Sequence, residues 1–139
     1  MEATKASFSF NRYWFDNIEL SSKTFRIGED ISVNFTPKCI FSKSKQVAVL
    51  GFDFFASNPN TEPFLKVSCF GEFLFNGISE LNQIPDFFYA NGIAILYPYL
   101  RAYISLVTQQ ANFGCAVILP LSNLAGMKDV VKASAKEIE

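Results

Sequence analysis

The segment from Gly92 to Val107 constrains the fold of this chain most, because it is apolar on nearly all sides. At the helical period, one side forms a continuous apolar stripe of Ile93, Leu96, Tyr97, Leu100, Ile104 and Val107. The opposite side carries Ile95, Tyr99, Ala102, Tyr103 and Leu106, and Arg101 is the only charge. A surface helix of a small domain keeps one polar face, so a helix without one has to be covered on two sides.

Three environments would cover such a helix. A membrane span needs about 20 predominantly apolar residues, and Arg101 at the centre of a bilayer would cost at least ~2.5 kcal/mol. A fully buried core helix of a monomer also fits the pattern. We expect instead that a second copy of the protein covers one side, because 139 residues provide little material to cover both. The predicted interface residues are Leu96, Tyr99, Leu100, Tyr103 and Val107.

Pro98 divides the predicted helical region, which runs roughly from residue 85 to residue 110. Proline in a helix interior is about 3 kcal/mol less favourable than alanine, whereas the first helical position accepts it because no N–H is needed there. We therefore expect a regular helix to begin near Pro98, with a turn or kink before it.

Alternation, and for the third strand a nearly continuous apolar run, predict four strands before this helix. The first covers residues 8–20, with Phe8, Phe10, Trp14, Ile18 and Leu20 on one side. The second covers residues 31–36, and Pro37 ends it or restricts it to a sheet edge. Two further strands cover residues 47–55 and 64–75, and a last helix is predicted over residues 127–139. The predicted fold is α+β: a four-stranded antiparallel sheet, then a long helix and a C-terminal helix, in one domain of residues 1–139.

The composition limits the functions that remain. The chain is half hydrophobic, with 16 Phe, 5 Tyr and 1 Trp, which exceeds the need of a small core and predicts apolar surface for association. A net charge of −1 without a basic run lacks the electrostatic footprint of a nucleic-acid-binding protein. The N-terminus has no apolar signal-peptide core, and Cys39, Cys69 and Cys115 lie far apart in apolar stretches. We expect reduced, buried thiols in a cytoplasmic protein.

The sequence contains few of the residues and motifs that enzymes use for catalysis. The chain has no histidine, the commonest general base, and no phosphate-binding or nucleophile-elbow motif. Asp16, Glu72 and Asp86 are the acids within largely apolar stretches, but they fall on separate elements at no diagnostic spacing. We expect them to be solvated, and we expect neither an enzyme nor a bound cofactor or metal.

Two blocks of sequence carry a family resemblance. The block Asn91-Gly-Ile-Ala-Ile-Leu-Tyr-Pro-Tyr-Leu-Arg-Ala-Tyr-Ile-Ser-Leu-Val107, followed by Phe113-Gly and Leu119-Pro-Leu-Ser-Asn-Leu124, resembles the signature of SecB-type protein-export chaperones. Residues 8–12 and 18–20 also resemble the first strand of that family. The chain thus looks like a divergent member, either a general chaperone or a stand-alone one associated with a toxin–antitoxin pair.

The resemblance implies the fold predicted above, paired into a dimer of dimers with the long helices between two layers of sheet. It also implies an ATP-independent holdase that keeps unfolded or newly made polypeptides in apolar surface grooves, competent for export or folding. By this resemblance Phe25 and Ile27 would line the groove, and Leu121, Leu124 and Met127 would cover it. Ordinary core packing is an equally good interpretation of each of these residues.

The resemblance breaks down at the acidic positions that family members offer to the SecA motor. Asn17, Ser21 and Lys66 stand at three of these positions, and a lysine repels a basic partner. Handing clients to SecA is therefore doubtful. A dedicated chaperone of one partner, such as an antitoxin, and a protein that binds a small apolar ligand remain as alternatives.

Overall fold

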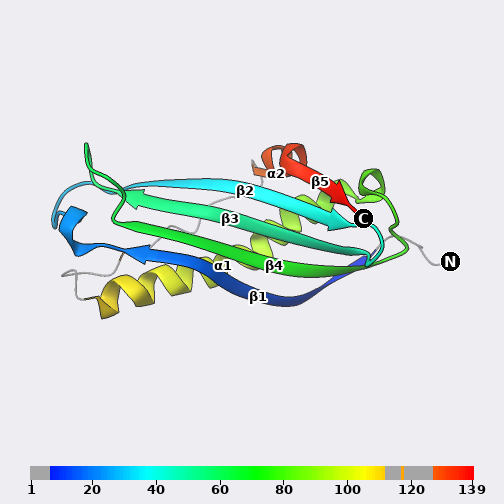
Figure 1. Cartoon of the computed structure of the whole chain (residues 1–139), viewed down its shortest axis with the longest axis horizontal. Helices are drawn as coiled ribbons and strands as arrows, with labels where there is room; N and C mark the ends of the chain where they lie inside the picture. The colour runs from blue at the N-terminus through cyan, green and yellow to red at the C-terminus, as the bar shows by residue number, and fades with distance from the viewer. Residues whose placement is uncertain (1–6, 112–116, 118–126) are drawn as a thin grey trace.

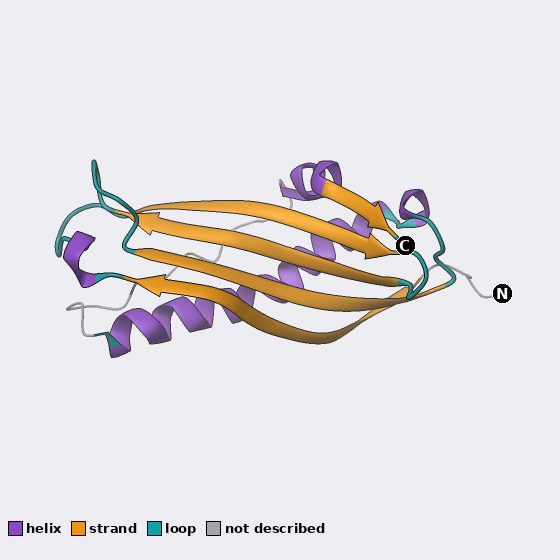
Figure 2. Cartoon of the chain, viewed as in Figure 1, coloured by secondary structure: helices purple, strands orange, loops and turns teal. Residues whose placement is uncertain are grey.

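In the computed structural model of the protein, one mixed sheet carries a long helix across one face (Figures 1 and 2). The structure describes residues 7–111, 117 and 127–139. Within them the sheet has the order β1-β4-β3-β2-β5. The strands are β1 (Ser7–Leu20), β2 (Ser32–Ser42), β3 (Val47–Ser57), β4 (Leu65–Asn76) and β5 (Ala135–Ile138). The helices are α1 (Asp86–Gln110), α2 (Lys128–Ser134) and the short 3-10 helices η1 (Ser22–Thr24) and η2 (Leu81–Gln83).

The α+β class is confirmed, and each of the four predicted strands is present. Strands β1 and β4, β4 and β3, and β3 and β2 pair antiparallel. The prediction of a purely antiparallel four-stranded sheet is wrong in one respect. A fifth strand, β5, pairs parallel to β2 over Cys39–Ser42 and makes the sheet mixed.

The predicted C-terminal helix over residues 127–139 is too long. Only Lys128–Ser134 is helical, and the chain then becomes strand β5. Beside the parallel ladder with β2, the Lys43 N–H donates to the Ile138 carbonyl at 2.9 Å and the Ser42 hydroxyl donates to the Glu139 carbonyl at 3.1 Å. A seven-residue helix is marginal by itself, so the open edge of β2 decides the conformation of the tail.

The core lies between α1 and the sheet face that it covers. Alternate residues of β3 and β4 point to this face and are buried, including Leu50, Phe52, Phe54, Val67 and Phe73. The helix contributes the apolar stripe predicted from the sequence: Phe88, Ile93, Leu96, Tyr97, Leu100 and Ile104 are all buried. A Cβ on Gly92 would come within 2.9 Å of the Leu50 side chain, so this glycine permits the close approach of helix and sheet.

The burial of Leu96 and Leu100 corrects part of the interface prediction. Both side chains have 0 % exposure within a single chain, so the chain's own sheet covers them and no second copy is needed. Tyr99 is 37 % exposed on the other side of the helix, while Tyr103 and Val107 are half-buried. The outer side of α1 is thus the part left for a partner.

Pro98 lies inside α1, and the expectation that the regular helix begins near it is wrong. A proline removes the hydrogen bond to the carbonyl four residues earlier, which belongs to Ala94. Both residues are exposed, so water can satisfy that carbonyl. The helix therefore tolerates the proline on its open side. No helix among the described residues is long and apolar enough to cross a membrane.

Strand β1 departs from the single alternation predicted for it. The register with β4 shifts between Phe10 and Arg12 and again between Phe15 and Ile18. Each extra residue moves the following side chains to the other face. Trp14 consequently stacks on Phe70 on the outer face, at 5.6 Å between ring centroids, instead of joining Phe8 and Phe10 on the side of α1.

Of the two alternatives predicted for Pro37, an end of the strand or a position at a sheet edge, the structure confirms the second. Strand β2 continues through it to Ser42, and Pro37 pairs with Phe52 of β3. On its other side β2 is paired with β5 only over Cys39–Ser42. Pro37 thus lies where the described chain leaves the edge open, so its missing N–H interrupts no ladder there.

Replacement of Pro98 by alanine should stabilise the protein by about 1–3 kcal/mol. Alanine restores the helical hydrogen bond and is favoured by about 3 kcal/mol in a helix interior, while the loss of a proline loosens the unfolded chain by up to about 1 kcal/mol. Urea unfolding at one fixed protein concentration measures the change. Ala94→Ser, on the same exposed side, is the control and should change little. An unchanged or lower free energy of unfolding for Pro98→Ala would contradict this account of the helix.

Candidate functional site

The connection from β1 to β2, residues 21–31, crosses the end of the sheet. The strands that it joins are separated by β4 and β3 in the sheet order, so the chain passes the ends of both (Figure 1). We call residues 21–31 the crossover segment. Its short helix η1 has no buried residue, and contacts with the turn after β3 position the remainder.

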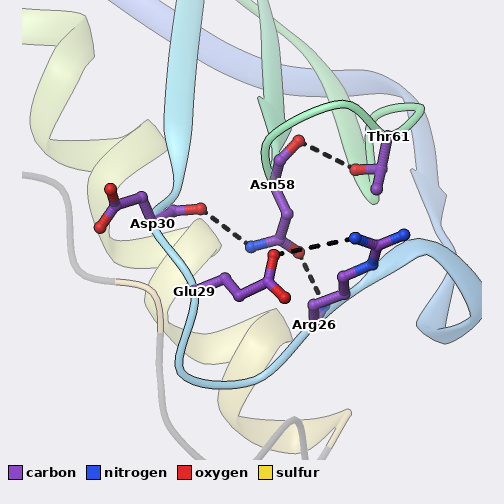
Figure 3. A network of polar contacts seen from close by, with 5 residues as sticks. All are labelled: Arg26, Glu29, Asp30, Asn58 and Thr61. Carbon is purple, nitrogen blue, oxygen red and sulfur yellow. Dashed lines mark hydrogen bonds and ion pairs between the residues drawn. The ribbon is translucent and has the colours of Figure 1, made fainter.

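Asn58 holds the crossover segment in place (Figure 3). Its side-chain oxygen accepts the Arg26 N–H at 2.7 Å, and its side-chain amide donates to the Asp30 carbonyl at 3.0 Å. The Thr61 hydroxyl donates to the Asn58 carbonyl at 2.9 Å. Asn58 is only 2 % exposed, so these bonds satisfy a buried amide. The Ser57-Asn-Pro-Asn60 stretch predicts a turn, but no pattern in it reveals this cross-link.

Two predicted groove residues lie on the crossover segment and have different surroundings. Phe25 is half-buried, with its ring edge-on to Phe64 at 4.9 Å. Ile27 is 66 % exposed, the largest exposure of any large apolar side chain described. Phe25 therefore supports the segment from within, and Ile27 presents an apolar side chain to the surface.

Ile27 is followed by further apolar side chains on the side of β2 that faces α1. Ile31 is 36 % exposed and Val33 38 % exposed, although Val33 pairs with the buried Ala56. Phe35 is half-buried, and its ring contacts Tyr97 of α1 at 5.9 Å. We call Ile27, Ile31, Val33 and Phe35 the crossover strip. The alternation of Ile31, Val33 and Phe35 predicts one strand face, but only the tertiary structure shows that this face is left partly uncovered.

The crossover strip borders a free strand edge. Among the described residues, β5 covers β2 only from Cys39 to Ser42, so the edge from Ser32 to Lys38 has no partner strand. An open edge offers backbone N–H and C=O groups to an extended chain. The strip and this edge together offer apolar contacts and backbone hydrogen bonds to the same ligand.

A second apolar surface lies where α1 meets β1. Tyr99 stacks on Tyr13 at 4.0 Å, Tyr103 stacks on Phe15 at 4.3 Å, and the ring of Phe87 lies 6.2 Å from that of Phe8. The exposed members of this surface, which we call the β1–α1 face, are Tyr13 (43 %), Phe87 (43 %), Tyr99 (37 %) and Leu106 (54 %). β1 is also the end strand of the sheet.

The other predicted groove residues are less informative. Met127 is half-buried and packs against the core just before α2. Leu121 and Leu124 lie outside the described residues. The proposed cover of the groove therefore stays a prediction.

The outer face of the sheet, away from α1, pairs its acids with cations. Glu72 receives hydrogen bonds from Asn11 at 2.7 Å and Arg12 at 3.2 Å, which lower its pKa. Asp53 forms a 3.0 Å ion pair with Lys38. Of the three positions where the family resemblance leads one to expect acids, Lys66 lies opposite Glu19 in the register of β1 and β4. Of the acids on this face, Glu72 and Asp53 are thus each paired with a cation.

The cysteines give no reactive site in the described chain. Cys39 and Cys69 are buried, and burial raises the pKa of each thiol to about 12. Such thiols stay protonated at neutral pH and are poor nucleophiles. No group of three or more acids and cysteines in the described ranges is arranged to hold a metal ion.

The sequence of the chain is similar to that of a known protein over part of its length. No model of a protein family matches the sequence. The chain is 42 % identical over 74 residues to the uncharacterized protein MJ0357 of Methanocaldococcus jannaschii, a match of 52 % of this chain and 44 % of that protein. The chain thus covers less than half of that relative.

A solved structure gives the fold. The SecB-like chaperone Rv1957 of Mycobacterium tuberculosis, in complex with a ChAD peptide from the antitoxin HigA1 (Rv1956), superposes with a TM-score of 0.54. The match covers 85 % of this chain and 91 % of that one. The fold is SecB-like. The sequence identity is 14 %, so the likeness concerns the fold alone.

Asn58→Ala should lower the free energy of unfolding by roughly 2–3 kcal/mol, because it leaves the Arg26 N–H and the Asp30 carbonyl without partners. Urea unfolding measures the loss, and hydrogen exchange should show faster exchange at the Arg26 amide. Asn34→Ala, at an exposed position of β2, is the matched control and should have little effect. An Arg26 amide that exchanges as slowly as in the unchanged protein would show that Asn58 does not anchor the crossover segment.

Proposed function

We propose that the protein is an ATP-independent holdase chaperone that binds unfolded or newly made polypeptides along the crossover strip. The observation that carries the proposal is the exposed apolar strip beside the free edge of β2. The SecB-like fold supports it, and the structural neighbour was solved with a peptide bound. Such binding needs no catalytic group, in keeping with a chain that has no histidine.

In this proposal an extended client adds to the sheet as a further strand at β2. Its backbone bonds to the edge between Ser32 and Lys38, and alternate side chains rest on Ile31, Val33 and Phe35. Pro37 supplies no N–H, so it weakens the ladder near β5. Backbone bonds are independent of client sequence, and apolar contacts tolerate many side chains. The site therefore suits varied clients rather than one ligand shape.

The second candidate is a dedicated chaperone of one partner, such as an antitoxin. It is favoured by the bound peptide of the structural neighbour, which comes from an antitoxin. Affinity purification of the chain from its native cells separates the two candidates. A single stoichiometric partner would favour the dedicated chaperone, and a broad mixture of clients the general holdase. A tightly held apolar small molecule would instead point to a ligand carrier.

We also propose that copies of the chain associate through the β1–α1 face into a dimer or a dimer of dimers. Exposed rings at Tyr13, Phe87 and Tyr99 lie beside the end strand β1, and an apolar surface with an open edge favours self-association. Of the predicted interface residues, Tyr99 and Tyr103 belong to this side of α1, whereas Val107 lies on the stripe that packs against the core. The SecA motor stays doubtful as a partner, because Asn17, Ser21 and Lys66 are not acids.

The holdase proposal predicts that Ile27→Ser and Val33→Ser weaken the suppression of aggregation of an unfolded model protein. Burying one such side chain contributes about 1.5 kcal/mol or more, so each variant should bind the client about tenfold more weakly. The measurement is light scattering of the aggregating client without ATP, over a titration of the chaperone. Ile40→Ser is the matched control: it lies in the same strand, is 41 % exposed, and points to the outer face. Equal losses in all three variants, or no suppression by the unchanged protein, would refute the proposal.

The assembly proposal predicts that Tyr99→Asp dissociates the oligomer. A charge placed in the β1–α1 face would have to be desolvated on association, whereas in the separated chain it faces water. Light scattering coupled to size-exclusion chromatography measures the mass, and circular dichroism checks the fold. Gln109→Asp introduces the same charge at an exposed position of the same helix and should leave the mass unchanged. An unchanged protein that is a folded monomer would contradict the proposal.

A further inference from the structure

A pocket of about 430 Å³ lies at the C-terminal end of the fold, apart from the crossover strip. Residues far apart in sequence line it, from η2 and the start of α1 and from α2 and β5. Helix α2 and strand β5 lie together near the C-terminus (Figure 1). Glu137 of β5 joins the two sides, because its carboxylate accepts the Leu81 N–H at 2.8 Å. The pocket therefore exists only because the tail pairs with β2.

The pocket is acidic. Glu80, Asp86 and Glu137 line it together with a single cation, Lys132. Three carboxylates against one ammonium leave two negative charges without a counter-charge in the lining. The Lys132 ammonium lies 2.7 Å from an Asp86 oxygen. This hydrogen bond lowers the pKa of Asp86, so its carboxylate is charged at neutral pH.

Tyr89 is a second and independent sign of a ligand. Its side chain lines the pocket while only 2 % exposed. Its hydroxyl makes no hydrogen bond to any residue in the described part of the chain. Every fully buried side-chain oxygen or nitrogen there has a partner, so this hydroxyl cannot be fully buried. The hydroxyl therefore opens into the pocket with its hydrogen-bonding capacity unused. Leu81 and Ile84 add apolar walls.

We propose that this pocket binds an aliphatic primary ammonium group, such as a lysine side chain or a free alkylamine. The carboxylates and the Tyr89 oxygen accept the N–H bonds, and Leu81 and Ile84 contact the methylene stem. The contact of Lys132 with Asp86 is an internal example of this chemistry. A metal ion fits less well, because the described acids include no group spaced to hold one. The inference does not depend on the holdase proposal.

The proposal is tested by titrating the full chain at pH 7 with N-acetyl-lysine methylamide and with 1,5-diaminopentane, followed by NMR shifts of the Leu81 and Glu137 amides. The uncharged N-acetyl-norleucine methylamide is the ligand control and should not bind. If only the lysine probe binds, the ligand is a peptide side chain. If both probes bind, free alkylamines are ligands as well. Failure of both amines to shift these amides overturns the proposal.

Substitutions in the pocket lining should change the affinity for the amine in opposite directions. Glu137→Gln removes a charged contact and Tyr89→Phe removes a neutral acceptor, and each should weaken binding roughly two- to fivefold. Lys132→Gln removes the competing ammonium and should strengthen binding by a similar factor. Glu29→Gln makes the same charge change as Glu137→Gln in the crossover segment and should have no effect. Equal changes in Glu29→Gln and Glu137→Gln, or weaker binding by Lys132→Gln, would show that the pocket is not the site.

Discussion

The packing of α1 on the sheet is the constraint on which the rest of the structure depends. The stripe from Phe88 to Ile104 fills the face made by alternate residues of β3 and β4, and Gly92 brings the helix close to Leu50. Burial of this area is the main favourable term for so small a domain. Once α1 covers this face, the apolar residues that it does not reach are left at the surface. They include the exposed residues of the crossover strip, and the β1–α1 face adds the outward-facing apolar side chains of α1 and β1.

The two surfaces differ in what else they offer. At the crossover strip, Asn58 fixes the connecting segment, and the neighbouring edge of β2 is free, so an extended chain finds both backbone and apolar partners. At the β1–α1 face, rings of the helix and of the end strand already stack on each other. A rigid aromatic surface of this kind loses little conformational entropy when a flat partner covers it. This difference supports a client on the strip and a second copy on the face.

The strands and the long helix were predictable because their signals are local. Period-two alternation locates three of the first four strands, a continuous apolar run locates β3, and the apolar stripe locates α1 from Asp86 to Gln110. The misses have tertiary causes. Pro98 lies within α1 because its side of the helix is exposed, Trp14 changes face because β1 contains register shifts, and the tail becomes β5 because β2 has an open edge. Leu96 and Leu100 are covered by the chain's own sheet rather than by a partner.

By itself, the sequence determined the α+β class, the buried stripe of α1 and the excess of aromatic side chains, because hydrophobic period and composition are properties of the chain alone. The family resemblance singled out Ile27 as a groove residue, and its side chain is exposed. Only the tertiary structure decided which apolar residues stay at the surface, since exposure depends on what the sheet and α1 leave uncovered. The surroundings of Asn58 and Tyr89 were decided in the same way. Their hydrogen-bonding partners, or the lack of them, arise from segments that meet only in the folded protein.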